Sequence, residues 1–400
     1  MKTMAEFFFM RDGFQTFSLE PTKHNFLLFG KRDRAQRDHL LNHLEEASYS
    51  LEGHKSVVIG DYGRGKTHQS RNIEFEIQRR KLNLYPVYIK CVELKAKDTF
   101  NSFFKELVLG IPTEQIKRVA QTYEEKSNKG EVTPLKDIIG NEDVTLVFRS
   151  GLAAPNIDIV RLSMRWLGGE QRLNMSLVSR DLPALHISKQ FGAVMKGFVQ
   201  LFQEIDGSVP LYLIDEAERF QQITNPDAYW SWLASLRELT EIVGVALIFF
   251  IGSKSRDELP AMFLQDEVIT RIGVTNYVEF YNQGRDDLRD FLRELFQTII
   301  RKGGVPEPLR PVLSEKIGEP DNSVPEELRA ILMESGQSID TYPLTGEAFD
   351  KLVETCATST LSNKPREVLK LVQKSAGRAI RKNKRIIDNS ILEEIMTEGY

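Results

Sequence analysis

The chain has 400 residues, 41% of them hydrophobic and 28% charged, and its formal net charge is -4. This composition is ordinary for a globular protein whose core is large enough for two domains, which excludes disordered and fibrous chains. A weakly acidic chain also lacks the overall positive field of a nucleic-acid binder, so any DNA contact has to come from local basic patches.

Three observations bear on the compartment. The two cysteines, Cys91 and Cys356, have no metal-type spacing and are typical of reduced thiols. The longest apolar run, at 243–251, is much shorter than the roughly 20 residues of a membrane helix. The aromatic run at 7–10 is too short for the core of a signal peptide. We therefore expect a cytoplasmic protein without a membrane segment.

Short apolar runs rich in β-branched or aromatic residues predict buried strands of a parallel sheet. Helical patterns separate these runs, which is typical of an α/β domain with helices on both faces of the sheet. The stretch between the second and third runs is longer than such a domain needs, so we expect an insertion at about 100–200. The predicted strands lie at 56–59, 86–91, 211–214, 245–251 and 277–280.

After the last predicted strand the pattern changes. Apolar residues such as Leu288 and Leu292 follow helical spacing, and a polar stretch at 303–343 is predicted to be rich in loops. A further helix is predicted to begin near Pro365, because proline suits the first turn of a helix. The expected domains are a P-loop α/β domain at 1–284 and a helical lid domain at 285–400.

Residues 60–67 read Gly-Asp-Tyr-Gly-Arg-Gly-Lys-Thr and match the phosphate-loop pattern G-x-x-x-x-G-K-[ST]. The glycines let the backbone curl so that its N–H groups and the following helix N-terminus point at phosphates. Lys66 is predicted to reach the β- and γ-phosphates, and the Thr67 hydroxyl to coordinate Mg²⁺. His68 has no partner at metal spacing and is given no metal role. We expect ATP to be held by Gly60, Asp61, Tyr62, Gly63, Arg64, Gly65, Lys66, Thr67 and His68.

The third predicted strand ends in two acids, Asp215 and Glu216. A strand of this kind beside the P-loop strand places Asp215 near Mg²⁺, directly or through water. Glu216 is then placed to orient or deprotonate the attacking water. The alternative is a strand that ends in ordinary surface acids. Behind an intact P-loop we favour the catalytic pair, which predicts hydrolysis of ATP.

Four further side chains, at three places in the chain, are candidates for sensing the nucleotide. Ser253 follows the fourth strand, between the P-loop and the acidic pair, with Lys254 as the second candidate there. Arg271 precedes the last strand and is predicted to reach a neighbouring subunit's ATP as an arginine finger. Arg366 opens the helix near Pro365 and is predicted to close over the nucleotide. The alternatives are a strand-end turn, a surface salt bridge and a solvated arginine.

The order of these features resembles that of AAA+ ATPases, and most of all their origin-recognition and initiator branch. In that branch the run Thr-Arg-Ile at 270–272, followed by Val-Glu-Phe at 278–280, has a familiar counterpart. The run Phe-Gly-Lys-Arg-Asp at 29–33 resembles the segment that contacts adenine there. The resemblance implies ATP, Mg²⁺ and a ring or filament of identical subunits.

A narrower resemblance covers about 25–385. Arg-Trp-Leu-Gly-Gly-Glu at 165–170, with Tyr-Leu-Ile-Asp-Glu-Ala-Glu at 212–218, looks like the BrxD-like ATP-binding proteins of BREX phage exclusion and their relatives in other bacterial defence operons. That resemblance implies anti-phage defence or genome maintenance together with a DNA-acting partner such as a helicase or nuclease.

The chain departs from the initiator pattern at two points. It ends about 35 residues past Arg366, which is too little for the winged-helix DNA-binding domain of such proteins. It also has Ser253 where asparagine is more usual. DNA remains a partner to test, but not through a winged helix. A basic cluster near the C-terminus offers phosphate contacts or, more simply, a solvated helix face: Arg378, Arg381, Lys382, Lys384 and Arg385.

We therefore predict an AAA+ ATPase that hydrolyses ATP to drive assembly and control of a DNA-acting partner. One alternative is a nucleotide-gated scaffold that binds ATP, oligomerises and recruits an effector with little turnover. A small-molecule kinase is a third reading, and Glu216 argues against it because a water-activating acid would waste ATP.

Overall fold

The computed structural model describes residues 2–171, 173–280, 284–358 and 364–398. The chain divides into two compact units, and each is described by itself. Unit 1 comprises residues 1–38, 61–76 and 280–400, and unit 2 comprises residues 39–60 and 77–279. The division falls inside two helices, α2 (Lys31–Ser50) and α3 (Lys66–Arg80).

The sheet lies in unit 2, apart from the last residue of its fifth strand, and has the strand order β2-β3-β4-β1-β5. The pairs β2–β3, β3–β4 and β4–β1 are parallel. β3 and β4 are buried along their whole length, as expected for parallel strands covered on both faces. The predicted α/β class is confirmed. The strands are β1 (Lys55–Gly60), β2 (Leu84–Lys90), β3 (Val209–Asp215), β4 (Ala246–Gly252) and β5 (Tyr277–Phe280).

One expectation about the sheet is wrong. The strand that ends in Asp215 does not lie beside the P-loop strand, because β4 separates β3 from β1. Hydrophobicity alone does not fix strand order, since every central strand of a parallel sheet has the same apolar pattern. The position predicted for Ser253 is confirmed, because β4 lies between the P-loop strand and the acidic strand.

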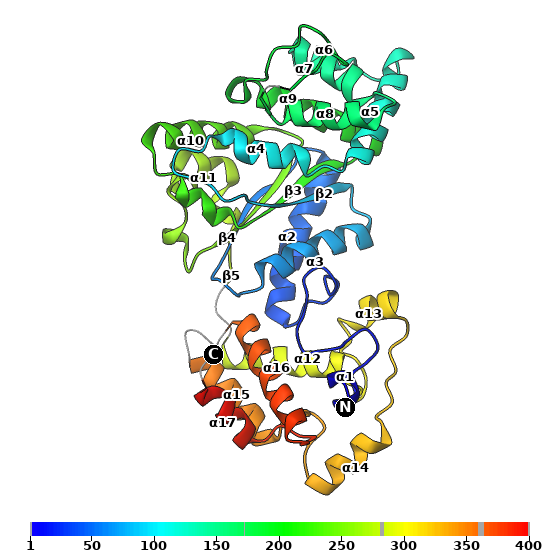
Figure 1. Ribbon diagram of the computed structural model, residues 1–400, viewed down its shortest axis with the longest axis vertical. Coiled ribbons are helices and arrows are strands. Elements are labelled where there is room, and N and C mark those ends of the chain that lie inside the picture. The colour runs from blue at the N-terminus through cyan, green and yellow to red at the C-terminus, as the bar shows by residue number, and fades with distance from the viewer. Residues whose placement is uncertain (1, 172, 281–283, 359–363, 399–400) are drawn as a thin grey trace. The chain divides into compact units, whose positions relative to one another are not determined.

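Helices make up the rest of unit 2, and the predicted insertion is helical. Figure 1 shows α5 to α9 gathered in a cluster of their own, while α4, α10 and α11 lie closer to the sheet. The buried side chain of Trp232 packs on the rings of Phe100, Phe103 and Phe220. The helices are α4 (Phe100–Leu109), α5 (Thr113–Asn128), α6 (Leu135–Ile139), α7 (Glu142–Leu146), α8 (Ile157–Leu167), α9 (Ile187–Asp206), α10 (Pro226–Glu241) and α11 (Asp266–Ile272), with a π-helical segment at Val147–Leu152. Short 3₁₀ segments lie at Ala217–Gln222, Arg256–Glu258, Ala261–Leu264 and Val274–Asn276.

Unit 1 is helical around its own apolar core. The prediction of a loop-rich stretch at 303–343 is wrong in part, because two short helices form there and bury Leu313 and Leu328. Each spans two to three turns, too few for a clear period in the sequence. The helices are α1 (Met4–Phe7), α12 (Arg285–Ile299), α13 (Arg310–Ile317), α14 (Glu326–Ser335), α15 (Gly346–Thr358), α16 (Pro365–Arg381) and α17 (Asn389–Thr397).

The N-terminal aromatic run belongs to the core of unit 1. Phe8 is fully buried and packs edge-on against Phe17 with ring centroids 5.8 Å apart. Met10 forms an antiparallel bridge with Ile300, and the Arg385 guanidinium lies over the ring of Phe7. The segment therefore contributes to folding. Over the described residues, no helix is long and apolar enough to cross a membrane.

Candidate functional site

The P-loop from Asp61 onward lies in unit 1 and leads directly into α3, which begins at Lys66. Gly63 and Gly65 have φ of +80° and +93°, values that favour glycine. A Cβ added at Gly65 would meet nothing within 4 Å, so the space beside this glycine is open. The Lys66 ammonium donates to the carbonyl of Asp61 at 3.1 Å, and Lys66 is largely buried. The loop is thus curled around its lysine at the start of a helix.

A second segment of unit 1 fixes the loop from the side of α2. The guanidinium of Arg64 is buried and lies 3.3 Å from the carboxylate of Asp33. Burial lowers the pKa of Arg64, while the Asp33 charge opposes that shift. Asp33 belongs to the run at 29–33, which the resemblance assigned to adenine contact. This run is held in turn by Glu294 of α12, which accepts from the Gly30 amide at 2.7 Å and forms a bidentate pair with Arg34.

His68 has a structural contact. Its Nε2 lies 2.5 Å from the carbonyl oxygen of Leu27, and burial lowers the pKa of its imidazole. The ring thus joins the first turn of α3 to the segment before α2. Over the described residues, no group of three or more His, Cys, Asp or Glu side chains is placed to hold a metal ion.

The start of α16 contacts the same loop within unit 1. Lys364 and Asp61 form an ion pair with Nζ 2.8 Å from Oδ2. The Arg366 amide donates to the carbonyl of Gly63 at 3.4 Å. The backbone of Arg366 is therefore beside the P-loop, and its closure over the nucleotide stays a prediction. Sequence analysis overlooked Lys364, although its place next to Pro365 and Arg366 was a signal.

In unit 2, Asp215 ends β3 and is almost fully buried. One carboxylate oxygen accepts from the Tyr88 hydroxyl at 2.9 Å, and the other accepts from the Glu216 amide at 2.9 Å. Two hydrogen bonds satisfy the buried carboxyl group and fix its direction. The side chain is thus held rigidly at the carboxyl end of its strand.

Glu216 follows in a left-handed conformation, with φ 58° and ψ 34°. A non-glycine residue there costs roughly 1–2 kcal/mol, and such strain is concentrated at functional sites. Its carboxylate forms ion pairs with Lys90, at 2.9 Å, and with Arg219. Lys90 is the register partner of Asp215 on β2. Sequence analysis found neither cation.

Ser253 lies directly after β4, and its amide donates to the carbonyl of Gly60 at 3.2 Å. Its hydroxyl donates to the carbonyl of Ser255 at 2.8 Å. Gly60 and Gly252 are register partners at the ends of β1 and β4. Because carboxyl ends of parallel strands share one edge of a sheet, unit 2 brings Gly60, Asp215 and Ser253 to the same edge.

Arg271 lies in α11 and is bound within its own chain. Its Nε donates to Glu241 at 2.5 Å, and one terminal nitrogen donates to the carbonyl of Glu267 at 2.6 Å. An arginine finger for a neighbouring subunit has to release Glu241 first. The surface ion pair is weak enough to allow that release.

Two other segments singled out in the sequence have structural roles. Trp166 is buried and its indole donates to the carbonyl of Pro183 at 3.0 Å, while Gly169 has φ +78° at the end of α8. The run at 165–170 is therefore a helix terminus packed into unit 2.

In the basic C-terminal cluster, four members form ion pairs with carboxylates: Arg378, Lys382, Lys384 and Arg385. That neutralisation weakens the prediction of phosphate contact.

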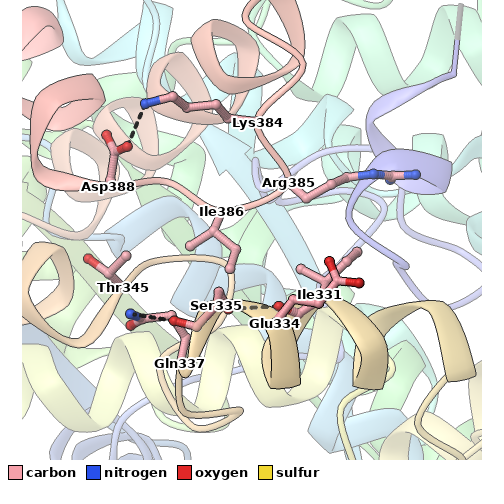
Figure 2. A pocket seen from close by; sticks show the side chains of 9 residues that line it. All are labelled: Ile331, Glu334, Ser335, Gln337, Thr345, Lys384, Arg385, Ile386 and Asp388. Carbon is pink, nitrogen blue, oxygen red and sulfur yellow. Dashed lines mark hydrogen bonds and ion pairs between the residues drawn. The ribbon is translucent and has the colours of Figure 1, made fainter.

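A hollow of about 460 Å³ lies elsewhere in unit 1, between α14 and the segment before α17 (Figure 2). Figure 2 shows the ion pair between Lys384 and Asp388 on its wall, with the Arg385 side chain directed away from it. None of its lining residues is a candidate for nucleotide binding.

The residues present fit the groups that the sequence implies. Unit 1 supplies glycine-rich backbone, the Lys66 ammonium and a helix N-terminus for an anion, and Thr67 is the second residue of that helix. Within unit 1 these groups suit a phosphate. Unit 2 supplies a fixed carboxylate at Asp215 and a strained one at Glu216, and a carboxylate is a ligand that Mg²⁺ accepts.

Comparison with known proteins gives structural likeness only. No family model matches the chain, and no curated protein matches it. Cdc6p from Pyrobaculum aerophilum is similar with 12% identity and a TM-score of 0.48, over 93% of this chain and 68% of that one. The Aeropyrum pernix ORC2 protein, in ADPNP–ADP complexes, has 11% identity and a TM-score of 0.48, over 98% and 73%.

A third similar structure is Drosophila ORC bound to DNA, with 11% identity and a TM-score of 0.44. The chain spans 61% of that protein, and 66% of the Aeropyrum pernix ORC1 protein solved with DNA. Closeness to BREX proteins stays a prediction.

Proposed function

We propose that this protein is an AAA+ ATPase that binds ATP with Mg²⁺ and hydrolyses it. The observation that carries the proposal is the P-loop, whose positive-φ glycines curl around Lys66 at the first residue of α3. Backbone amides, a helix N-terminus and an ammonium together form a strong phosphate site.

Each candidate residue has a distinct part in the proposed reaction. Lys66 neutralises charge on the β- and γ-phosphates, and Thr67 and Asp215 are the residues that would hold Mg²⁺. Bound Mg²⁺ supplies neutralisation of phosphate charge. Glu216 takes the proton of the attacking water, and Ser253 contacts that water or the γ-phosphate.

Steady-state release of phosphate tests hydrolysis. Wild-type protein is compared with Glu216→Gln, which keeps the shape of the side chain and removes its basicity. We expect a fall of about 100-fold or more, because general-base catalysis contributes ~10²–10⁴. The binding of ATP is measured on the same samples. Equal rates in the two proteins would remove Glu216 as the base.

A second candidate function is a nucleotide-gated scaffold that binds ATP, oligomerises and recruits an effector with little turnover. The observation in its favour is that Lys90 and Arg219 both occupy the carboxylate of Glu216. No phosphate release from either protein, with tight ATP binding and with DNA and candidate partners present, would support the scaffold.

Assembly is part of the proposal through Arg271. ATP in one subunit is read by Arg271 of its neighbour, in a ring or filament of identical subunits. Mass photometry with and without ATP is the test, and Arg271→Ala is expected to prevent ATP-dependent assembly. A strict monomer under both conditions, at micromolar protein, would overturn this role.

The wider role rests on the sequence resemblance. We propose that the domains at 1–284 and 285–400 act in the cytoplasm on a DNA-acting helicase or nuclease, in anti-phage defence. Phosphate release with and without duplex DNA measures direct coupling to DNA. Plaque counts in a host that carries wild-type protein or the Glu216→Gln variant measure defence, and equal counts would contradict it.

A further inference from the structure

Asp61 places a carboxylate inside a loop that is built to hold an anion. The Lys66 ammonium donates to the carbonyl of this same residue at 3.1 Å, so Asp61 and Lys66 are immediate neighbours in space. Like charge so close to the phosphates opposes their binding unless another group compensates it. The second residue of the P-loop pattern accepts any residue type, so the pattern itself gives no reason for an acid.

The carboxylate of Asp61 is held at both oxygens. Oδ1 accepts from the Tyr62 amide at 2.7 Å, and Oδ2 lies 2.8 Å from Nζ of Lys364. The side chains of Lys364 and Asp61 are only 13% and 18% exposed. An ion pair that is largely shielded from water is stronger than one on the open surface.

The side chain of Lys364 is held in place by the P-loop. A Cβ added at Gly63 would lie 3.5 Å from Cδ of Lys364, so the lysine stem runs along the loop backbone. The Arg366 amide donates to the Gly63 carbonyl at 3.4 Å. The Lys364 ammonium and the Arg366 amide therefore both contact the loop, at the start of α16.

We propose that Lys364 is a positioning residue for nucleotide binding, and that it acts by cancelling the charge of Asp61. This inference rests on the proposed function and adds to it a regulator of the same loop. Lys364 acts through Asp61, because its ammonium is paired with that carboxylate. Loss of the compensating charge leaves an acid beside the phosphates, and the expected cost is about tenfold in ATP affinity.

A double-mutant cycle tests the mechanism on the full-length chain. The dissociation constant of ATP–Mg²⁺ is measured by calorimetry for wild type, Lys364→Met, Asp61→Asn and the double variant. Lys364→Met is expected to weaken binding about tenfold, and Asp61→Asn to strengthen it. The double variant is expected to bind within about threefold of wild type, because both charges are gone.

Two further variants act as controls. Lys370→Met removes an exposed lysine of α16 that pairs with Glu367 at 2.8 Å, and we expect it to bind ATP as wild type does. Lys364→Arg keeps the charge and is expected to bind more tightly than Lys364→Met. Thermal unfolding of each variant shows whether it is folded, and Asp61→Asn still decides the matter if the methionine variant unfolds.

The outcomes are distinct. Wild-type affinity in Lys364→Met overturns the inference. If that variant is unfolded, an Asp61→Asn affinity for ATP–Mg²⁺ no tighter than that of wild type overturns it. A double variant as weak as Lys364→Met also overturns it, because Lys364 would then contact the nucleotide itself. No ATP binding by wild type overturns the proposed function, and this inference with it.

Discussion

The two units hold their candidate residues in different ways. In unit 2, Gly60, Asp215 and Ser253 lie at the ends of strands, and the register of one parallel sheet places them at the same edge. In unit 1, the P-loop is held by Asp33 and Lys364, which come from segments far away in the sequence. Backbone pairing positions one set, and side-chain ion pairs position the other.

The difference concerns charge as well as position. Within unit 1, Asp33 pairs with Arg64 and Asp61 pairs with Lys364 at the loop. Within unit 2, the carboxylate of Glu216 meets two bases, Lys90 and Arg219. We infer that unit 1 is arranged to receive an anion, whereas in unit 2 the candidate base is restrained.

The largest expected effect tests the anion site of unit 1. Lys66→Ala removes the ammonium that the loop encloses, and we expect ATP affinity to fall by about 100-fold or more, since a charged hydrogen bond is lost in a shielded position. Calorimetry measures it. Arg79→Ala, later in α3, serves as a control for a lost positive charge. An unchanged affinity in Lys66→Ala would contradict the proposed phosphate site.

The second prediction concerns how the stability of unit 1 depends on pH. Lys302 is buried, with its ammonium donating to the carbonyls of Asp340 and Tyr342 at 2.6 and 3.1 Å. Burial lowers the pKa of Lys302 from 10.5 to about 7. The unfolded chain therefore binds more protons between about pH 7 and 10, and the stability of unit 1 rises with pH in that window.

We expect the free energy of unfolding of unit 1 to rise by about 2 kcal/mol across this pH window. This is less than the full pKa shift implies, because the two carbonyls favour the charged form of Lys302. Hydrogen exchange of α12 amides between pH 7 and 10, corrected for intrinsic rates, measures it. Lys302→Met is expected to remove the slope with pH, whereas Lys351→Met, an exposed lysine of α15, should keep it. The same slope in both variants would rule out Lys302 as its source.

The third prediction is the counterpart in unit 2. The ring of His54 stacks on His43 at 5.3 Å, and His39 lies beside His43 at 4.6 Å. Burial, followed by the charges of His43 and Lys55, lowers the pKa of His54 from 6.5 to about 4. The unfolded state then binds the proton more readily, so unit 2 loses stability as the pH falls from about 6.5 to 4.

We expect the free energy of unfolding of unit 2 to fall by about 1–2 kcal/mol over this pH range. All three tryptophans, at 166, 230 and 232, lie in unit 2, so tryptophan fluorescence during urea unfolding follows this unit. His54→Gln should flatten the dependence on pH, and His186→Gln, at an exposed position, should not. If acid destabilises the His54 variant as much as wild type, the cause lies elsewhere.

The sequence was enough to predict the elements of the sheet and the residues at their ends. Continuous apolar runs and the P-loop pattern are local, and β1 to β5 lie within two residues of the predicted strands. Strand order depends on contacts between distant segments. The prediction that β3 lies beside the P-loop strand was therefore wrong. The helices α13 and α14 were missed because two or three turns give too little periodicity.

The partners of the site residues also divide into those near in sequence and those brought close only by tertiary structure. Arg219 is three residues after Glu216, a spacing that the sequence does contain. Lys90 reaches Glu216 only because β2 pairs with β3 in register, and Lys364 reaches Asp61 only through the packing of α16. Contacts between distant segments depend on tertiary structure, which periodicity and motifs do not describe.

The smallest expected effect bears on the restraint of Glu216. Lys90 is 59% exposed, so its ion pair is weak, and Arg219 remains when Lys90 is lost. We expect Lys90→Met to raise the rate of phosphate release about two- to threefold, because a carboxylate with one fewer ion-pair partner turns more freely toward the attacking water. The ATP affinity is expected to change less than the rate.

Lys95→Met, an exposed lysine shortly after β2, is the matched control for a lost charge. A lower rate in Lys90→Met would mean that Lys90 positions the carboxylate for catalysis and does not restrain it. Because the same variant leaves the P-loop pairs of unit 1 intact, a change in rate without a matching change in affinity assigns restraint to unit 2 and anion binding to unit 1.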